Sequence, residues 1–319
     1  MGMPKLKPDL GKKYRLITRS DMDGLVCAVL LKDLGIIDAI EFVHPKDMQD
    51  GKVKVDDSVI TTNLPYVEGV FMAFDHHASE AERVQGHPEN HIIFPGAPSA
   101  ARVVYDYFGG LDTFPEVSAD MMAAVDKADS AAFKKDEILD AKGWVLLSFV
   151  MDSRTGLGRF RDFSISNYQL MMLLIDAVRA HKDISGILEL PDVKERVDMY
   201  KAHQEKAREQ ILRCGKQHKN LVVLDLRNEE TIWAVNRFMI YSLFPTTNIS
   251  MHVMWGREKQ NTVLAIGKSI LDRSSKTDVG VLCLKYGGGG HHAAGTCQVA
   301  NDTSDATVKD IITAINADG

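Results

Sequence analysis

The stretch VFMAFDHH, residues 70–77, joins a run of five apolar side chains to an aspartate and two histidines. The apolar run has the length and composition of a buried β-strand. Neighbouring side chains of an extended chain point to opposite sides, so His76 and His77 face different surroundings. We therefore expect Asp75, His76 and His77 at the end of a buried strand, with one imidazole placed to bind a metal ion and the other to reach a ligand oxygen.

Strands and helices alternate along the sequence on both sides of this stretch. Further strands are expected at residues 14–19, 39–43, 58–62 and 91–94, and helices at residues 24–34 and 98–110. This alternation predicts an α/β fold, with a mainly parallel sheet and helices on its faces. Functional groups gather at the carboxyl ends of strands in such sheets, and Asp21, Asn63 and Asp75 each follow a strand. We expect these three side chains to face one crevice.

The second half of the chain predicts a separate, smaller α+β domain. Helical patterns occupy residues 118–134 and 167–190, and residues 192–218 form a long, highly charged segment. We interpret this segment as a helix that joins two domains, residues 1–191 and residues 219–319. In the second domain, strands are expected at residues 221–226, 248–255, 262–266 and 296–299, and helices at residues 236–243, 277–286 and 306–317.

Composition and charge narrow the class of protein. The chain has 319 residues, 45% of them hydrophobic and 26% charged, which is ordinary for a globular protein of two domains. No apolar run is long enough to span a bilayer and the N-terminus lacks an apolar leader, so we expect a cytoplasmic protein with no membrane partner. The four cysteines stand far apart, which predicts neither a disulfide framework nor a zinc site. A net charge of −6 disfavours long nucleic acids. It leaves open a short phosphate-containing ligand, including short single-stranded nucleic acid, and a homodimer.

Two carboxylates flank one residue in Asp21-Met22-Asp23-Gly24, directly after a predicted strand and before a predicted helix. A hard cation needs oxygen ligands that converge, and this turn supplies two. The same pattern is also typical of a helix N-cap with an acidic residue in the first turn. The sequence leaves both interpretations open for Asp21 and Asp23.

A glycine run, YGGGGHHAAG, occupies residues 286–295. Its four consecutive glycines let backbone N–H groups approach an anion, and His291 and His292 add donors. A flexible linker is the alternative interpretation. It fits less well, because the run lies between a predicted helix and a predicted strand and not between domains.

In this order the motifs resemble those of the DHH phosphoesterase superfamily with a C-terminal DHHA1 domain, and in particular its RecJ-like, exopolyphosphatase-related and nano-RNase-like members. The family's four successive motifs and the DHHA1 signature are matched by Asp21–Gly24, residues 62–66, Asp75-His76-His77, Asp129 and residues 287–291. The resemblance covers essentially the whole chain. It implies a hydrolase that acts with Mn²⁺ or Mg²⁺ on a short or terminal phosphoester or phosphoanhydride, such as an oligonucleotide, a dinucleotide or polyphosphate.

The resemblance also implies roles for individual residues. Asp23, His76 and Asp129 would hold one metal ion firmly, while Asp21 would hold a second ion and Asn63 would bridge the two. Asp75 and His77 would form the catalytic group, with His77 meeting the scissile phosphate or protonating the leaving oxygen. In the second domain, the implied substrate-binding residues are Arg273, Gly288, Gly289, Gly290, His291 and His292.

Two positions depart from the family pattern. The first motif usually carries a histidine shortly before its first aspartate, where this chain has Ile17 and Arg19, and the usual bridging aspartate of the second motif is Asn63. An amide oxygen can bind a hard cation but cannot supply the negative charge that holds two dications together. We therefore expect a weak second ion at Asp21. Arg19 either takes the vacated charge position and binds phosphate, or is an ordinary arginine at a strand end.

Other assignments stay open at this level. Asp126 and Asp129 lie on one face of a predicted helix, so either could be the fourth-motif ligand, and we favour Asp129. Arg154 belongs to an arginine- and glycine-rich stretch, residues 152–161, that is either an anion contact or an exposed loop. The missing histidine and Asn63 also motivate a second hypothesis, a degenerate DHH protein that binds a nucleotide or phosphate ligand with little or no turnover.

Overall fold

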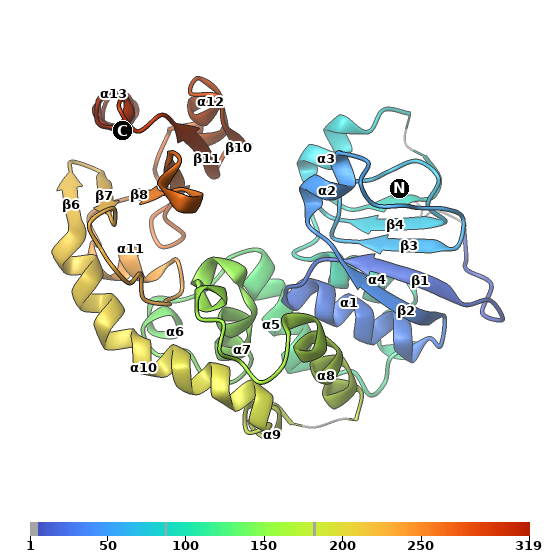
Figure 1. The fold of residues 1–319 in the computed structure, drawn as a ribbon. Helices are drawn as coiled ribbons and strands as arrows, with labels where there is room; N and C mark the ends of the chain where they lie inside the picture. Colours follow the sequence, from blue (N-terminus) through green and yellow to red (C-terminus); the bar gives the residue numbers. More distant parts are fainter. Residues whose placement is uncertain (1–5, 87, 181–182) are drawn as a thin grey trace. The chain divides into compact units, whose positions relative to one another are not determined.

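The computed structural model describes residues 6–86, 88–180 and 183–319, and their contacts divide the chain into two compact units (Figure 1). The first unit comprises the described residues up to Ala132, with Lys142–Ser153 and Phe160–Asp198. The second comprises Phe133–Ala141, Arg154–Arg159 and Met199–Gly319. The predicted domains are continuous ranges, whereas two short segments of the predicted first domain pack with the second unit.

A five-stranded sheet forms the centre of the first unit (Figure 1). Its strands are β1 (Tyr14–Thr18), β2 (Ile37–Phe42), β3 (Val59–Thr62), β4 (Met72–Asp75) and β5 (His91–Ile93). They lie in the order β2-β1-β3-β4-β5, and every neighbouring pair is parallel. The apolar side chains of Leu16, Ile60 and Phe74 are fully buried, as expected for a sheet covered on both faces. The predicted mainly parallel sheet is confirmed.

The helices of the first unit pack on this sheet or on one another. They are α1 (Met22–Asp33), α2 (Pro45–Gln49), α3 (Ala78–Arg83), α4 (Ala100–Tyr107), α5 (Ala119–Asp129), α7 (Gly143–Met151), α8 (Asn167–Arg179) and α9 (Ile184–Leu188). Helix α1 is buried along most of its length because it packs against β1 and β2 and also against α4, α5 and α8. Helix α5 ends earlier than the predicted helix 118–134, and Ala131 just beyond it has a left-handed backbone conformation that breaks the helix.

A six-stranded mixed sheet forms the centre of the second unit. Its strands are β6 (Gly215–His218), β7 (Leu221–Asp225), β8 (Ile249–Trp255), β9 (Thr262–Lys268), β10 (Gly289–His291) and β11 (Ala294–Val299). They lie in the order β10-β11-β9-β8-β7-β6, and all pairs are antiparallel except β7 with β8. The helices of this unit are α6 (Lys135–Leu139), α11 (Met239–Leu243), α12 (Val279–Leu284) and α13 (Ser304–Asp318). One apolar core joins strand residues such as Met251 and Leu264 to Val279 of α12 and Ile311 of α13, which confirms the α+β class.

The long charged segment forms helix α10 (Pro191–Cys214). The prediction of a helix up to residue 218 is wrong, because the chain continues from Gly215 as strand β6, which pairs with β7. A side chain at Gly215 would place its Cβ 2.6 Å from the carbonyl oxygen of Ile211, so only glycine allows this close passage.

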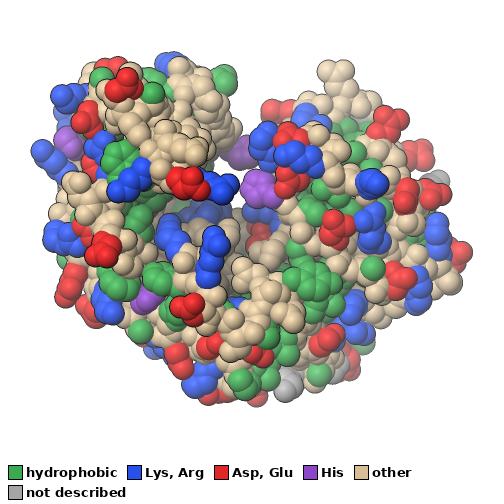
Figure 2. All heavy atoms as spheres, viewed as in Figure 1, with side chains coloured by type: hydrophobic (Ala, Val, Ile, Leu, Met, Phe, Trp, Pro, Cys, Tyr) green, Lys and Arg blue, Asp and Glu red, His purple; other side chains and the backbone are tan. Residues whose placement is uncertain are grey.

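None of the helices in the described ranges is long and apolar enough to cross a bilayer. Basic and acidic side chains are interspersed on the face drawn in Figure 2.

Candidate active site

The carboxyl ends of three neighbouring strands bring predicted residues together at one edge of the first sheet. Strand β3 pairs with both β1 and β4, so Asp21, Asn63 and Asp75 stand at the ends of adjacent strands. Asn63 has a left-handed backbone with a φ of 54°, a conformation that asparagine adopts more readily than most residues. Its Nδ2 lies 3.4 Å from Oδ1 of Asp21. The sharp turn after β3 therefore directs the amide toward the end of β1.

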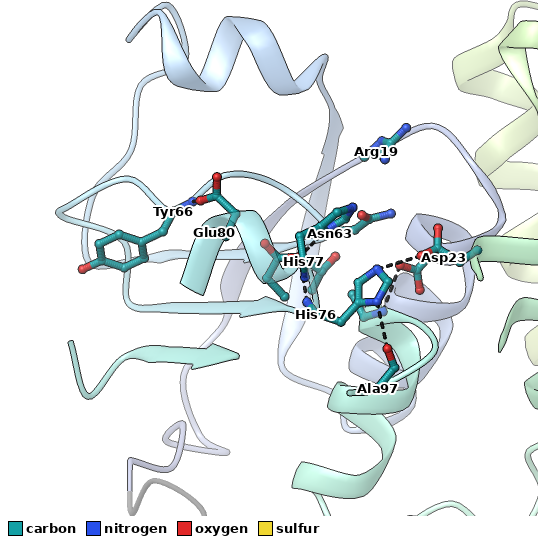
Figure 3. A network of polar contacts seen from close by, with 12 residues as sticks. Arg19, Asp23, Asn63, Tyr66, His76, His77, Glu80 and Ala97 are labelled. Carbon is teal, nitrogen blue, oxygen red and sulfur yellow. Dashed lines mark hydrogen bonds and ion pairs between the residues drawn. The ribbon is translucent and has the colours of Figure 1, made fainter. Parts of the chain in front are cut away.

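Asp23, His76 and Asp129 form a compact cluster beside this edge, and Figure 3 shows His76 directed toward it. One ligand atom from each residue lies within 4.8 Å of the other two, and Nε2 of His76 lies 2.7 Å from Oδ2 of Asp129. On its other side, Nδ1 of His76 lies 3.0 Å from the carbonyl oxygen of Ala97. A carbonyl oxygen can only accept, so Nδ1 donates there and Nε2 is the ring atom that faces the carboxylates.

Burial and mutual charge interactions shift the pKa values of all three side chains in this cluster. Asp23 is 2% exposed, and burial, followed by the charges of Asp129 and Asp21, raises its pKa well above the ordinary value. Burial lowers the pKa of His76, but contact with Asp129 and the charge of Asp23 outweigh burial and raise this pKa to about 9. The pKa of Asp129 is lowered because its contact with His76 outweighs burial. The cluster therefore stabilises a positive charge at its centre, whether a proton on His76 or a cation.

The chemistry of the donor set fits a divalent cation. Carboxylate and amide oxygens are the ligands that Mg²⁺ and Mn²⁺ prefer, and an imidazole nitrogen suits Mn²⁺ as well. In addition, Oδ2 of Asp75 and Oδ1 of Asn63 are buried and have no hydrogen-bond partner among the described residues. Buried oxygens in this condition are costly unless a cation or a water satisfies them. Asp23, His76 and Asp129 could hold such a cation.

The N-terminus of helix α4 supports the cluster. The two carboxylate oxygens of Asp23 accept hydrogen bonds from the backbone N–H groups of Ala100, at 3.0 Å, and Ala101, at 2.7 Å. These groups are among the donors that a helix leaves free at its start. They hold a buried carboxylate in one orientation. This support was not predicted from the sequence, where the Pro98-Ser99 helix start is the signal that could have indicated it.

Asp126 and Asp129 have different surroundings although both lie on α5. Oδ1 of Asp126 accepts from the hydroxyl of Ser99 at 2.7 Å, and Oδ2 accepts from Nη2 of Arg102 at 2.6 Å. Asp126 therefore ties α5 to the start of α4. Asp129 is the residue that lies in the cluster with His76.

His77 and Asp75 form a second polar pair next to the cluster. Asp75 is 1% exposed, and its Oδ1 lies 2.7 Å from Nδ1 of His77 and accepts from the backbone N–H of His76 at 2.8 Å. The His77 side chain is 36% exposed. A buried carboxylate that holds Nδ1 of an accessible imidazole leaves Nε2 to exchange a proton with a ligand.

Asp21 has one of the two roles that the sequence leaves open, that of a helix N-cap. Its Oδ1 accepts from the backbone N–H of Gly24 at 3.0 Å and so caps helix α1. Its Oδ2 lies 3.1 Å from Nε of Arg19, which places the guanidinium at the edge of the site. Arg19 is therefore held in an ion pair with Asp21.

The predicted substrate residues Gly288, Gly289, Gly290, His291, His292, Arg273 and Arg154 all lie in the second unit. The glycine run is only partly a loop, because Gly289–His291 form strand β10, which pairs with β11. His291 and His292 are exposed, and the ring of His292 lies between Nζ of Lys268, at 2.9 Å, and Oδ2 of Asp278, at 3.2 Å. The side chains of Arg273 and Arg154 are exposed.

Comparisons with known proteins agree with this fold. The chain is 60% identical to the pGpG-specific phosphodiesterase PggH from Vibrio cholerae, with a TM-score of 0.86 over 96% of this chain and 100% of that one. An exopolyphosphatase-related protein from Bacteroides fragilis, 13% identical, has a TM-score of 0.51 over 96% and 92% of the two chains. RecJ from Thermus thermophilus in complex with Mn²⁺, also 13% identical, has a TM-score of 0.55 over 96% of this chain and 52% of that chain. The last two share the fold alone. No family model and no curated protein sequence matches the chain.

The similarity to PggH extends over nearly the whole of both chains, and 60% identity over such a length requires common descent. The predicted fold class and the predicted enzyme class, a phosphoesterase, are confirmed. The chain belongs to the DHH phosphoesterase family.

Proposed function

We propose that this protein is a metal-dependent phosphodiesterase that hydrolyses the linear dinucleotide pGpG to two molecules of GMP. The observation that carries the proposal is the 60% identity to a pGpG-specific phosphodiesterase over 96% of the chain. The cluster of Asp23, His76 and Asp129 supplies a site that suits this chemistry. The proposal narrows the predicted substrates, short phosphoesters and phosphoanhydrides, to one dinucleotide.

In this proposal Asp23, His76 and Asp129 hold one Mn²⁺ or Mg²⁺. When bound, the ion would neutralise charge on the phosphodiester and make a nearby water more acidic. The protein's contribution is to keep the ligands in place before the ion arrives. Backbone N–H groups fix both oxygens of Asp23, and the carbonyl of Ala97 fixes the ring of His76.

We assign the proton transfer to His77. Hydrolysis forms a bond between a water oxygen and phosphorus and breaks the bond between phosphorus and the 3′ oxygen of the first guanosine. The leaving 3′ oxygen needs a proton, which Nε2 of His77 can donate while Asp75 holds Nδ1 at 2.7 Å. Asp75 also fixes the orientation of the ring for this transfer.

We assign binding of a terminal phosphate to the second unit, and metal binding and catalysis to the first. The N–H of Gly288 donates to the carbonyl oxygen of Cys283 at 3.0 Å, so the donors that we assign to a phosphate are the backbone of Gly289 and Gly290 and the exposed His291. Arg273 and Arg154 add exposed guanidinium groups. His292 is held by Lys268 and Asp278, so we assign it a supporting role beside the strand. A terminal phosphate of pGpG is the group that we expect these donors to bind.

A substrate panel tests the proposed function. The purified protein is incubated in the presence of Mn²⁺ with one substrate at a time, and the products are separated by chromatography. The substrates are pGpG, pApA, a longer oligonucleotide, cyclic di-GMP and polyphosphate. We expect GMP from pGpG at a rate at least tenfold above every other substrate. Faster release of phosphate from polyphosphate would contradict the proposal. Tight binding of pGpG without GMP would favour a degenerate binding protein.

A further inference from the structure

Asp21, which would hold the second ion of a two-metal centre, is occupied by N–H donors. Its Oδ2 lies 3.1 Å from Nε of Arg19, and its Oδ1 accepts from the backbone of Gly24 at 3.0 Å and from Nδ2 of Asn63 at 3.4 Å. Both carboxylate oxygens are thus engaged by the protein itself. A cation at Asp21 would lie next to a guanidinium of the same sign.

A two-metal centre also needs a negatively charged group between its two ions, and Asn63 does not supply one. Its side chain is neutral, buried and oriented with Nδ2 toward Asp21. One amide oxygen remains, and it cannot offset two dications separated by a few ångströms. The residues around Asp21 therefore do not fit a second metal ion.

Arg19 places a permanent positive charge in this position. Its Nε lies 3.1 Å from Oδ2 of Asp21, and the side chain is 30% exposed, so part of it is accessible to a ligand. Figure 3 shows Arg19 at the end of its strand beside the residues of the site. A guanidinium held on one edge by a carboxylate presents its other edge as a planar fork that matches phosphate oxygens.

We propose that this protein works with a single divalent ion, and that Arg19, oriented by Asp21, replaces the second ion by binding the scissile phosphate of the dinucleotide. This inference rests on the proposed hydrolysis of pGpG for its kinetic part and on the metal site alone for its binding part. Ion and guanidinium would then bind the phosphate from different sides and neutralise the charge that develops in the transition state.

Metal counting tests the binding part without any turnover. Mn²⁺ bound per chain is measured by equilibrium dialysis with elemental analysis for wild-type protein and for a double variant, Arg19→His with Asn63→Asp. We expect one ion per wild-type chain and two per double-variant chain. Two ions of similar affinity in the wild-type protein would overturn the inference, even if pGpG hydrolysis is confirmed.

Chemical rescue tests the kinetic part. Arg19→Ala is expected to lower kcat/KM for pGpG about 100-fold or more, and added guanidinium ion is expected to restore at least a tenth of the lost activity. Arg15→Ala on the same strand removes an ion pair with Glu41 outside the site and is expected to leave the rate unchanged. A wild-type rate in Arg19→Ala would overturn the inference. If the variant fails to fold, Arg19→Lys gives the same test, because its point charge cannot form the planar fork. Absence of pGpG hydrolysis in wild-type protein that binds one Mn²⁺ would instead overturn the proposed function alone.

Discussion

At the scale of single residues, Asp75 connects the strand to the proposed chemistry. Its Oδ1 accepts from the backbone of His76 and lies 2.7 Å from the His77 ring, while its Oδ2 is buried without a partner in the described ranges. One oxygen thus fixes the turn after β4 and orients an imidazole. We expect the negative charge of this buried carboxylate, more than its shape, to matter for the rate of hydrolysis.

Asp75→Asn should separate charge from shape. We expect kcat for pGpG to fall at least about 100-fold, because a neutral amide holds Nδ1 of His77 less strongly than a carboxylate does. The melting temperature should change little, since the amide oxygen can still accept from the backbone of His76. Asp120→Asn, an exposed acid in the first turn of α5, is the matched control and should keep the wild-type rate. Equal rates in the two variants would remove Asp75 from the catalytic group.

Most residues of the candidate site could be predicted from the sequence, because the signals that indicate them are local. The apolar run and the residues Asp75, His76 and His77 that follow it all lie within eight consecutive residues, 70–77. The choice between Asp126 and Asp129 needed the structure, because both side chains lie on one helical face. Arg102 and Ser99, distant in sequence, are what engage Asp126. Such partners are set by packing between helices and leave no periodic signal.

At the scale of elements, strand β10 shows why its glycines differ. A Cβ at Gly288 would lie 2.2 Å from the carbonyl oxygen of Thr296, and one at Gly290 would lie 2.3 Å from that of Ala294. Gly290 also has a φ of +155°. At Gly289, by contrast, a Cβ would meet no atom within 4 Å. No strand was predicted between the helix expected at residues 277–286 and the strand expected at residues 296–299. Glycine disfavours strands, and the pairing with β11 overrides that preference.

An alanine scan of this strand should separate stability from binding. Gly288→Ala and Gly290→Ala are expected to destabilise the protein by about 1–3 kcal/mol, because each forces backbone apart. Gly289→Ala should change stability by less than about 1 kcal/mol and raise KM for pGpG, because its open face is where we place a substrate phosphate. Denaturant unfolding and steady-state kinetics measure the two effects. An unchanged KM in Gly289→Ala would exclude this face from the substrate site.

At the scale of the whole molecule, the proposed metal ligands all lie in one of the two compact units. Asp23, His76 and Asp129 belong to the first unit, while residues 133–141 and 154–159 interrupt its sequence and pack with the second. The two domains predicted from the sequence are continuous ranges, so the prediction does not include this interruption. Contacts between segments distant in sequence decide which unit a short connecting segment joins, and composition does not report them.

Metal binding should therefore protect one unit selectively. We expect saturating Mn²⁺ to slow amide hydrogen exchange in α1, β4 and α5, which carry or border the ligands, and to leave β7, β8 and β9 unchanged. At 100 times the dissociation constant the stabilisation would be about 2.7 kcal/mol. Hydrogen exchange with mass spectrometry, with and without a chelator, measures this. Protection confined to the second sheet would place the metal elsewhere.

The most direct test of the central claim is the rate of GMP formation from pGpG by metal-free protein to which Mn²⁺ is returned, compared between wild type and Asp129→Asn. The account predicts hydrolysis by the wild-type protein only when Mn²⁺ is present, and a loss of at least about 100-fold in Asp129→Asn at the same Mn²⁺ concentration. Full activity in the presence of a chelator, or a wild-type rate in Asp129→Asn, would contradict it.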